Sequence, residues 1–185
     1  MDFVDGTLHR HSSNVDKFAI NWPQPLNESR VYSWVSKVVR GKLKELALHV
    51  NHWYHCSLES LVSLQLGIPG SSGFTFPKHI SLPRLKRLIL NAFEFSEESW
   101  NGQLFSNSPV LEHLVLHFCK FRMRNFSILI PTLKFFTIHV SRSEEIGLDC
   151  VFNIDAPRLI SFSHSDFVAK EFILSSFPSV GVLQQ

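Results

Sequence analysis

Residues 111–121 read Leu-Glu-His-Leu-Val-Leu-His-Phe-Cys-Lys-Phe, and this stretch decides the fold. Its first, fourth and sixth positions are leucines, followed by Cys119 at the ninth and Phe121 at the eleventh. The fourth and sixth positions are two residues apart, so their side chains leave the same face of a β-strand. The first leucine closes the turn before that strand. The stretch therefore predicts a short strand with one apolar face.

The same spacing of apolar residues recurs along the chain. Repeats begin at Val15, Leu43, Leu61, Leu85, Leu111, Leu133 and Leu159, and a partial eighth repeat begins near residue 180. Successive starts are 18 to 28 residues apart, with a mean of 24, and leucine-rich repeats are about 20–29 residues long. One repeat cannot bury its own apolar edge, so the repeats must stack. We predict one leucine-rich-repeat domain over residues 1–185. Its fold class is α/β, a solenoid with a curved parallel β-sheet on the concave face and loops and short helices on the convex face.

Prolines and helix signals mark the segments between the strands. A proline lies two residues before the first apolar position of four repeats, where it ends the preceding segment: Pro83, Pro109, Pro131 and Pro157. Residues 27–40 carry an apolar stripe at helical spacing and begin with Asn27, a residue type that caps helices. Residues 96–106 carry Glu97 and Glu98 near their start, followed by apolar residues, which favours a second helix.

Composition and charge narrow the class of protein. The net charge is only +2 with histidine neutral, too small to indicate nucleic acid or a membrane surface as a partner. Seventeen Phe against two Tyr indicate interior filling. Three cysteines, an odd and sparse set, argue against a disulfide framework. Neither a signal peptide nor a transmembrane stretch is expected, so we expect the protein in the cytoplasm or nucleus.

Several segments carry a recognisable family pattern. They are residues 81–86 (Ser-Leu-Pro-Arg-Leu-Lys), residues 108–114 (Ser-Pro-Val-Leu-Glu-His-Leu) and residues 155–159 (Asp-Ala-Pro-Arg-Leu). Residues 3–20 and 30–48 look like the first repeat, the helix and the second strand of the same family. On these segments, the chain resembles the plant F-box/leucine-rich-repeat proteins of the type that often end in an FBD domain.

The resemblance implies a function. Members of this family use an N-terminal F-box to dock on a Skp-type adaptor of a cullin ubiquitin ligase, and their repeats capture the substrate. No F-box is found within residues 1–185. The resemblance therefore implies the substrate-recognition part of an F-box-type ubiquitin ligase receptor, with a Skp-type adaptor as partner only if an F-box lies upstream. The alternative is a truncated leucine-rich-repeat interaction or regulatory protein with no ubiquitin-ligase role.

No pattern in the sequence predicts an enzyme, a cofactor or a metal site. Residues 49–56 hold three histidines and a cysteine, but no second ligand pair completes a zinc site. Residues 164–166 read His-Ser-Asp, and neighbours on a strand point apart instead of converging as a triad. The glycine-rich residues 67–73 lack the Lys-Ser/Thr of a phosphate loop. The basic residues between 37 and 44 indicate a solvated face.

The candidate binding surface lies on the concave face. On each strand the third, fifth and seventh positions of the repeat point away from the core. From these columns we select the candidate partner-binding residues Lys17, Glu45, His49, Arg87, Asn91, His113, His117, Phe135 and His139. Seven strands about 4.8 Å apart make a face about 29 Å long, which suits an unknown protein or peptide.

Histidines are concentrated in this candidate surface. His117 and His139 belong to consecutive repeats at the same position, so we expect them to be neighbours across the sheet. We hypothesise a polar, pH-sensitive recognition column around His113, His117 and His139, because histidine changes its charge near neutral pH. The alternative is a solvated edge with no partner.

Overall fold

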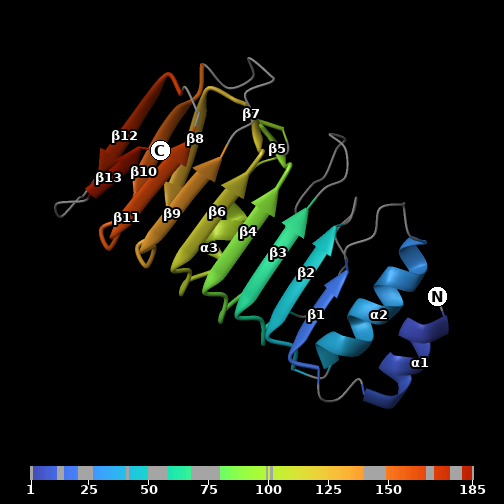
Figure 1. Cartoon of the computed structure of the whole chain (residues 1–185). Helices are drawn as coiled ribbons and strands as arrows, with labels where there is room; N and C mark the ends of the chain where they lie inside the picture. The colour runs from blue at the N-terminus through green and yellow to red at the C-terminus, as the bar shows by residue number, and fades with distance from the viewer. Residues whose placement is uncertain are drawn as a thin grey trace.

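A computed structural model describes residues 2–11, 15–20, 27–40, 42–49, 58–67, 80–98, 100, 102–139, 149–165, 169–175 and 181–184. Its main sheet has eight parallel strands that lie side by side in chain order (Figure 1). They are β1 (Lys17–Ile20), β2 (Glu45–His49), β3 (Ser63–Gly67), β4 (Arg87–Asn91), β6 (His113–His117), β9 (Phe135–His139), β11 (Ser161–Ser165) and β13 (Gly181–Gln184). Each of the first seven begins two residues after the first apolar position of its repeat. The predicted α/β class of stacked parallel repeats is confirmed.

The remaining helices and strands that the structure describes form a second layer. Its helices are α1 (Asp2–His11), α2 (Glu28–Arg40) and α3 (Gln103–Ser106). Its strands form a pair, β5 (Glu94–Ser96) with β7 (Lys120–Arg122), and a parallel sheet in the order β12 (Glu171–Ser175), β10 (Val151–Asp155), β8 (Asn125–Leu129). In Figure 1 the two longer helices lie at the β1 end, and the additional strands lie toward the β11 end. The second layer thus changes from helix to strand along the chain.

Helix α2 forms as its sequence predicts. The Asn27 side chain accepts a hydrogen bond from the backbone N–H of Arg30 at 3.3 Å, which confirms the N-cap. Its apolar stripe is buried, and Trp34 donates from Nε1 to the Asp5 carboxylate of α1 at 2.7 Å. In the described part of the chain, no helix is both long and apolar enough to cross a membrane.

The helix predicted over residues 96–106 is wrong for most of its length. Among the described residues of this range, only the single turn α3 is helical. The reason is that Phe95 and Ser96 belong to β5, which pairs with β7. The ring of Phe95 lies 5.1 Å from that of Phe121 in the neighbouring repeat and is buried. Packing between repeats therefore overrides the helix signal of the acidic residues that follow.

A tight turn precedes each main-sheet strand from β3 to β11. Before β4, the N–H of Leu85 donates to the carbonyl of Leu82 at 3.1 Å, and an equivalent bond closes the turns before β3, β6, β9 and β11. The second place of four of these turns is a proline: Pro83, Pro109, Pro131 and Pro157. Proline favours this place because its fixed φ matches the turn. The turn before β3 has Glu59 there instead.

A forked hydrogen bond repeats at the start of each main-sheet strand from β2 to β11. The carbonyl of Lys86 accepts from the N–H groups of both Glu112 and His113, at 2.9 Å each. The same fork links each neighbouring pair of strands from β1 to β11. It satisfies both donors at the point where the turn becomes strand, and it holds neighbouring repeats in one register.

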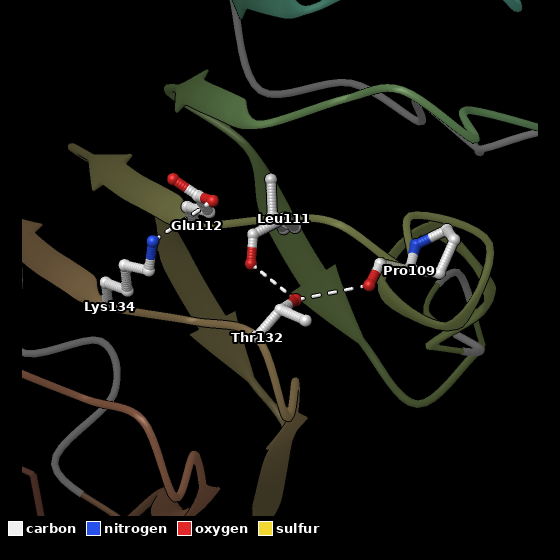
Figure 2. A network of polar contacts seen from close by, with 5 residues as sticks. All are labelled: Pro109, Leu111, Glu112, Thr132 and Lys134. Atoms are coloured by element: carbon white, nitrogen blue, oxygen red, sulfur yellow. Dashed lines mark hydrogen bonds and ion pairs between the residues drawn. The ribbon is translucent and has the colours of Figure 1, made fainter.

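Side chains add further links between repeats, as Figure 2 shows for β6 and β9. The hydroxyl of Thr132 lies 2.8 Å from the Leu111 carbonyl and 3.3 Å from that of Pro109. Beside it, Lys134 and Glu112 form an ion pair at 3.1 Å. In the turn before β3, Ser60 occupies the place equivalent to Thr132 and donates to the Leu43 carbonyl at 2.8 Å. A hydroxyl at this place thus ties one repeat to the previous one.

Phenylalanine fills the interior between the two layers. Phe126 is 0% exposed, and its ring lies 4.9 Å from those of Phe95 and Phe121 and 5.6 Å from that of Phe152. Toward the β11 end, Phe162 of the main sheet lies 5.4 Å from Phe172 of β12. The prediction that this residue type fills the core is confirmed for these rings.

Candidate functional site

One face of the main sheet carries the candidate residues. Along β2, β4, β6 and β9 the side chains alternate between buried and accessible. The buried ones, such as Leu88 and Leu114, are 0% exposed and point into the second layer. We call the other side the open face. It is formed by the first, third and fifth residues of the main-sheet strands β2, β3, β4, β6, β9 and β11, and by the first and third residues of β1.

The strand register aligns the open face in three rows. The start row holds Lys17, Glu45, Ser63, Arg87, His113, Phe135 and Ser161. The middle row holds Ala19, Ala47, Gln65, Ile89, Val115, Thr137 and Ser163. The end row includes His49, Gly67, Asn91, His117 and His139. All nine residues selected from the sequence lie in the start row or the end row.

The start row contains two groups of interacting side chains. At the N-terminal end, Lys17 Nζ and Glu45 Oε2 form an ion pair at 3.1 Å, and both side chains are mostly exposed. Such a pair contributes little to stability in water. Further along, the rings of His113 and Phe135 stack at 4.6 Å with an angle of 16° between their planes. Arg87 is the register neighbour of His113 on the other side. A cation, an imidazole and an aromatic ring are therefore consecutive in this row.

The end row brings histidines together. His117 and His139 are register partners, and their rings meet edge to face at 4.9 Å, which confirms the expected pairing. Asn91 neighbours His117 on β4 and donates from Nδ2 to the Leu66 carbonyl at 3.4 Å. His49 is separate from this group, because its imidazole lies over Gly67, where a Cβ atom would overlap the ring.

Phe118 lies at the rim of the open face, and the sequence did not single it out. It follows β6 directly, is 59% exposed, and its ring lies 6.1 Å from that of His117. Its φ of 53° is left-handed, as is the 58° of Ala92 after β4. Both N–H groups donate to the next strand, Ala92 to His117 and Phe118 to His139. The signal available in the sequence was a large aromatic residue where the repeat leaves the strand.

The open face lowers the proton affinity of two histidines. Partial burial, together with the positive charge of Arg87, lowers the pKa of His113 below its ordinary 6.5. Partial burial and the neighbouring His139 lower the pKa of His117 below the same value. Both imidazoles are therefore mainly uncharged at neutral pH, and a bound anion would favour their charged forms.

The described residues offer no second kind of site. Among them, no group of three or more His, Cys, Asp or Glu side chains is placed to hold a metal ion. Residues 50–56, which hold the other histidines and the cysteine of the segment 49–56, lie outside the described residues, as do Asp166 and residues 68–73. His164 packs against Phe172 at 5.6 Å and does not join the open face. Burial raises the pKa of the Cys119 thiol to about 12, so it stays protonated and is a poor nucleophile.

Comparison with known proteins gives a consistent result. A family model described as FBD-associated F-box protein At5g56370, LRR repeats, matches residues 31–171. "F-box/LRR-repeat protein At3g59210" of Arabidopsis thaliana is 27% identical over 97% of this chain and 39% of its own length. "Putative F-box/FBD/LRR-repeat protein At1g66290" of the same plant is 35% identical over 96% of this chain and 41% of its own length. The chain thus spans about two-fifths of these relatives. No solved structure matches it.

Proposed function

Because the chain belongs to the FBD-associated F-box protein family and matches its leucine-rich repeats, we propose that it is a protein-binding module whose open face recognises the substrate of an F-box-type ubiquitin ligase receptor. The observation that carries this proposal is the open face itself. Parallel sheets are usually covered on both faces. In the described part of this chain, the second layer covers only the face that carries the inward leucines.

The size and chemistry of the open face support a macromolecular partner. Seven strands span about 29 Å, longer than a metabolite requires. The face mixes aromatic, cationic and amide side chains, which are common in protein interfaces. Phe135 remains 37% exposed although its ring stacks on His113. An aromatic ring held in place by a neighbour loses little conformational freedom on binding, which makes it a suitable anchor.

Two matched variants test the location of the binding surface. Val115→Arg places a bulky charge at the middle of β6 on the open face, whereas Ser127→Arg makes the same addition at the middle of β8, where Ser127 is exposed on the second layer. Tagged wild-type chain and both variants are expressed in plant cells, and their bound proteins are compared by mass spectrometry. We expect partners to be retained by Ser127→Arg and lost from Val115→Arg, with both variants folded by circular dichroism. Equal capture by the two variants contradicts the proposal.

A second experiment separates the ligase role from simple binding. The chain is joined to a known F-box and mixed with its adaptor, cullin and ubiquitin enzymes, and with a partner that the wild-type chain captures through the open face. If the chain recognises substrates, that partner becomes ubiquitinated, and Val115→Arg prevents the reaction. A partner that binds but stays unmodified, and whose amount in cells does not change when the proteasome is inhibited, favours the alternative of an interaction protein without a ligase role.

A further inference from the structure

The charge of the open face from β3 to β11 is one-sided. From β3 to β11, the described open-face positions include no aspartate or glutamate. They include Arg87 and three histidines, and no described carboxylate lies within ion-pairing distance of Arg87. The acidic Glu112, just before β6, is already paired with Lys134 at 3.1 Å. Among its described open-face positions, this part of the surface therefore offers a cation and imidazoles but no acid.

The basic groups lie at the two ends of β4, β6 and β9. Arg87 and His113 are neighbours in the start row, and His117 and His139 are neighbours in the end row. The two rows are four residues apart along the strand, about 13 Å at a rise of about 3.3 Å per residue. Between them, the middle row places Ile89 beside Val115. The order along the strands is thus basic, apolar, basic.

An extended peptide has the same spacing. Its side chains at positions i, i+2 and i+4 leave one face, and the first and last are about 13 Å apart. We propose that the open face binds an extended acidic peptide segment with two carboxylates four residues apart and an apolar residue midway between them. One carboxylate lies over Arg87 and His113, and the other lies over His117 and His139. This inference rests on the proposed function, because it names the class of substrate segment that the open face recognises.

The chemistry of each contact supports an acidic peptide. The planar guanidinium of Arg87 suits a carboxylate, which it can hold through two parallel hydrogen bonds. The apolar middle row favours a Leu-like side chain between the two acids. A nucleic acid fits less well, since its backbone requires several cationic contacts, and this face has one permanent cation among its described positions between β3 and β11.

Peptide binding should depend on pH. The charges of Arg87 and Lys134 disfavour the charged form of His113, whereas the carboxylate of Glu112 favours it. His139 disfavours the charged form of His117. A carboxylate placed on these imidazoles favours their protonated forms, so binding takes up protons. We therefore expect affinity to increase as the pH falls from about 8 to about 6, where the carboxylates of the peptide remain ionised.

The test uses three labelled peptides and the whole chain, with fluorescence anisotropy as the readout. The probe is Gly-Glu-Ser-Leu-Ser-Glu-Gly. The spacing control, Gly-Ser-Glu-Leu-Glu-Ser-Gly, has the same composition with its acids two residues apart, and the charge control replaces both acids with glutamine. We expect the probe to bind about fivefold or more tightly than either control, and more tightly at about pH 6 than at about pH 8.

Two variants locate the effect. Arg87→Ala should weaken binding of the probe about fivefold, whereas Arg158→Ala, which removes an exposed positive charge from the turn before β11, should leave it unchanged. Equal binding of all three peptides, or displacement of the probe by single-stranded RNA at lower concentration than by unlabelled probe, overturns the inference. If the peptides fail while Val115→Arg still loses its captured partners, the inference is wrong and the proposed function stands. If both tests fail, the open face is not the binding surface.

Discussion

Replacement of Phe126 by alanine should remove a large part of the stability of the fold. Phe126 comes from β8 and is 0% exposed. Its ring lies 4.9 Å from the rings of Phe95 and Phe121, 5.5 Å from Trp100 and 5.6 Å from Phe152. These neighbours belong to three different repeats, so the side chain joins the second layer across repeats. Its removal leaves a cavity that rigid aromatic walls cannot close.

The size of the effect follows from measured behaviour of buried rings. Phe→Ala substitutions in cores cost about 3–5 kcal/mol, and each aromatic pair adds about 0.5–1.5 kcal/mol beyond the area it buries. Five neighbouring rings, counting Phe105 at 6.3 Å, place Phe126 at the upper part of the range. We therefore expect Phe126→Ala to lower the free energy of unfolding by about 4–5 kcal/mol. Folded proteins are stable by about 5–15 kcal/mol, so this loss is most of the stability of a domain at the lower end of that range.

Urea unfolding followed by circular dichroism measures this loss. The matched control is Phe118→Ala, because Phe118 is 59% exposed and lies outside the core. Its free energy of unfolding should stay within about 0.5 kcal/mol of wild type. A loss below about 1 kcal/mol for Phe126→Ala, or equal losses for both variants, would refute the account of the aromatic core.

Three further predictions concern the turns, the links between repeats and the histidines. Glu59→Pro should raise the free energy of unfolding by about 0.4–1 kcal/mol, because proline already fills the equivalent place in four other turns and restricts the unfolded chain. Thr132→Val should lower it by about 1 kcal/mol, because the hydroxyl bond to the Leu111 carbonyl at 2.8 Å is lost. Stability should fall as the pH drops below 6.5, because the pKa values of His113 and His117 are lower in the folded chain than their ordinary 6.5. As the pH falls, the two histidines take up protons at a higher pH in the unfolded chain than in the folded chain, which favours unfolding. Urea midpoints measured between about pH 5 and 8 test this.

Each of these predictions has its own control. Glu59→Ala separates the effect of proline from loss of the carboxylate, and a lower midpoint for Glu59→Pro than for Glu59→Ala contradicts the turn assignment. Thr132→Ser keeps the hydroxyl and should keep more of the stability than the valine variant. The double variant His113→Gln/His117→Gln should show a flatter pH dependence, and a slope identical to that of wild type would mean that other groups cause it.

The main sheet could be predicted because its pattern repeats. Leu114 and Leu116 are two residues apart and recur in each neighbour, so the sequence specifies both the strand and the side that it buries. The same periodicity predicted His117 beside His139, and the strand register pairs them. The prediction that each repeat begins with an apolar residue after a turn likewise agrees with the hydrogen bonds that close those turns.

The strands of the second layer were not predicted, because they have no constant spacing. Strands β5, β7, β8, β10 and β12 pair with segments of neighbouring repeats, and the helix expected over 96–106 gave way to that pairing. The sequence did contain a signal for β8 and β10, namely the pair Phe126 and Ile128 and the pair Phe152 and Ile154. Each pair alternates as a strand does and begins seven residues before the first leucine of the next repeat. Contacts on the open face, such as the stacking of His113 on Phe135, depend on side-chain conformation that periodicity does not specify.

Site-specific photo-crosslinking tests the central claim most directly. A photo-reactive residue is placed at Val115, in the middle of the open face, or at Ser127, in the middle of β8 on the second layer. Cells expressing each version are irradiated, and covalent adducts of the chain are compared. The account predicts adducts with a partner protein from position 115 and none with that partner from position 127. Adducts with the same partner from position 127 alone would show that the open face is not the binding surface.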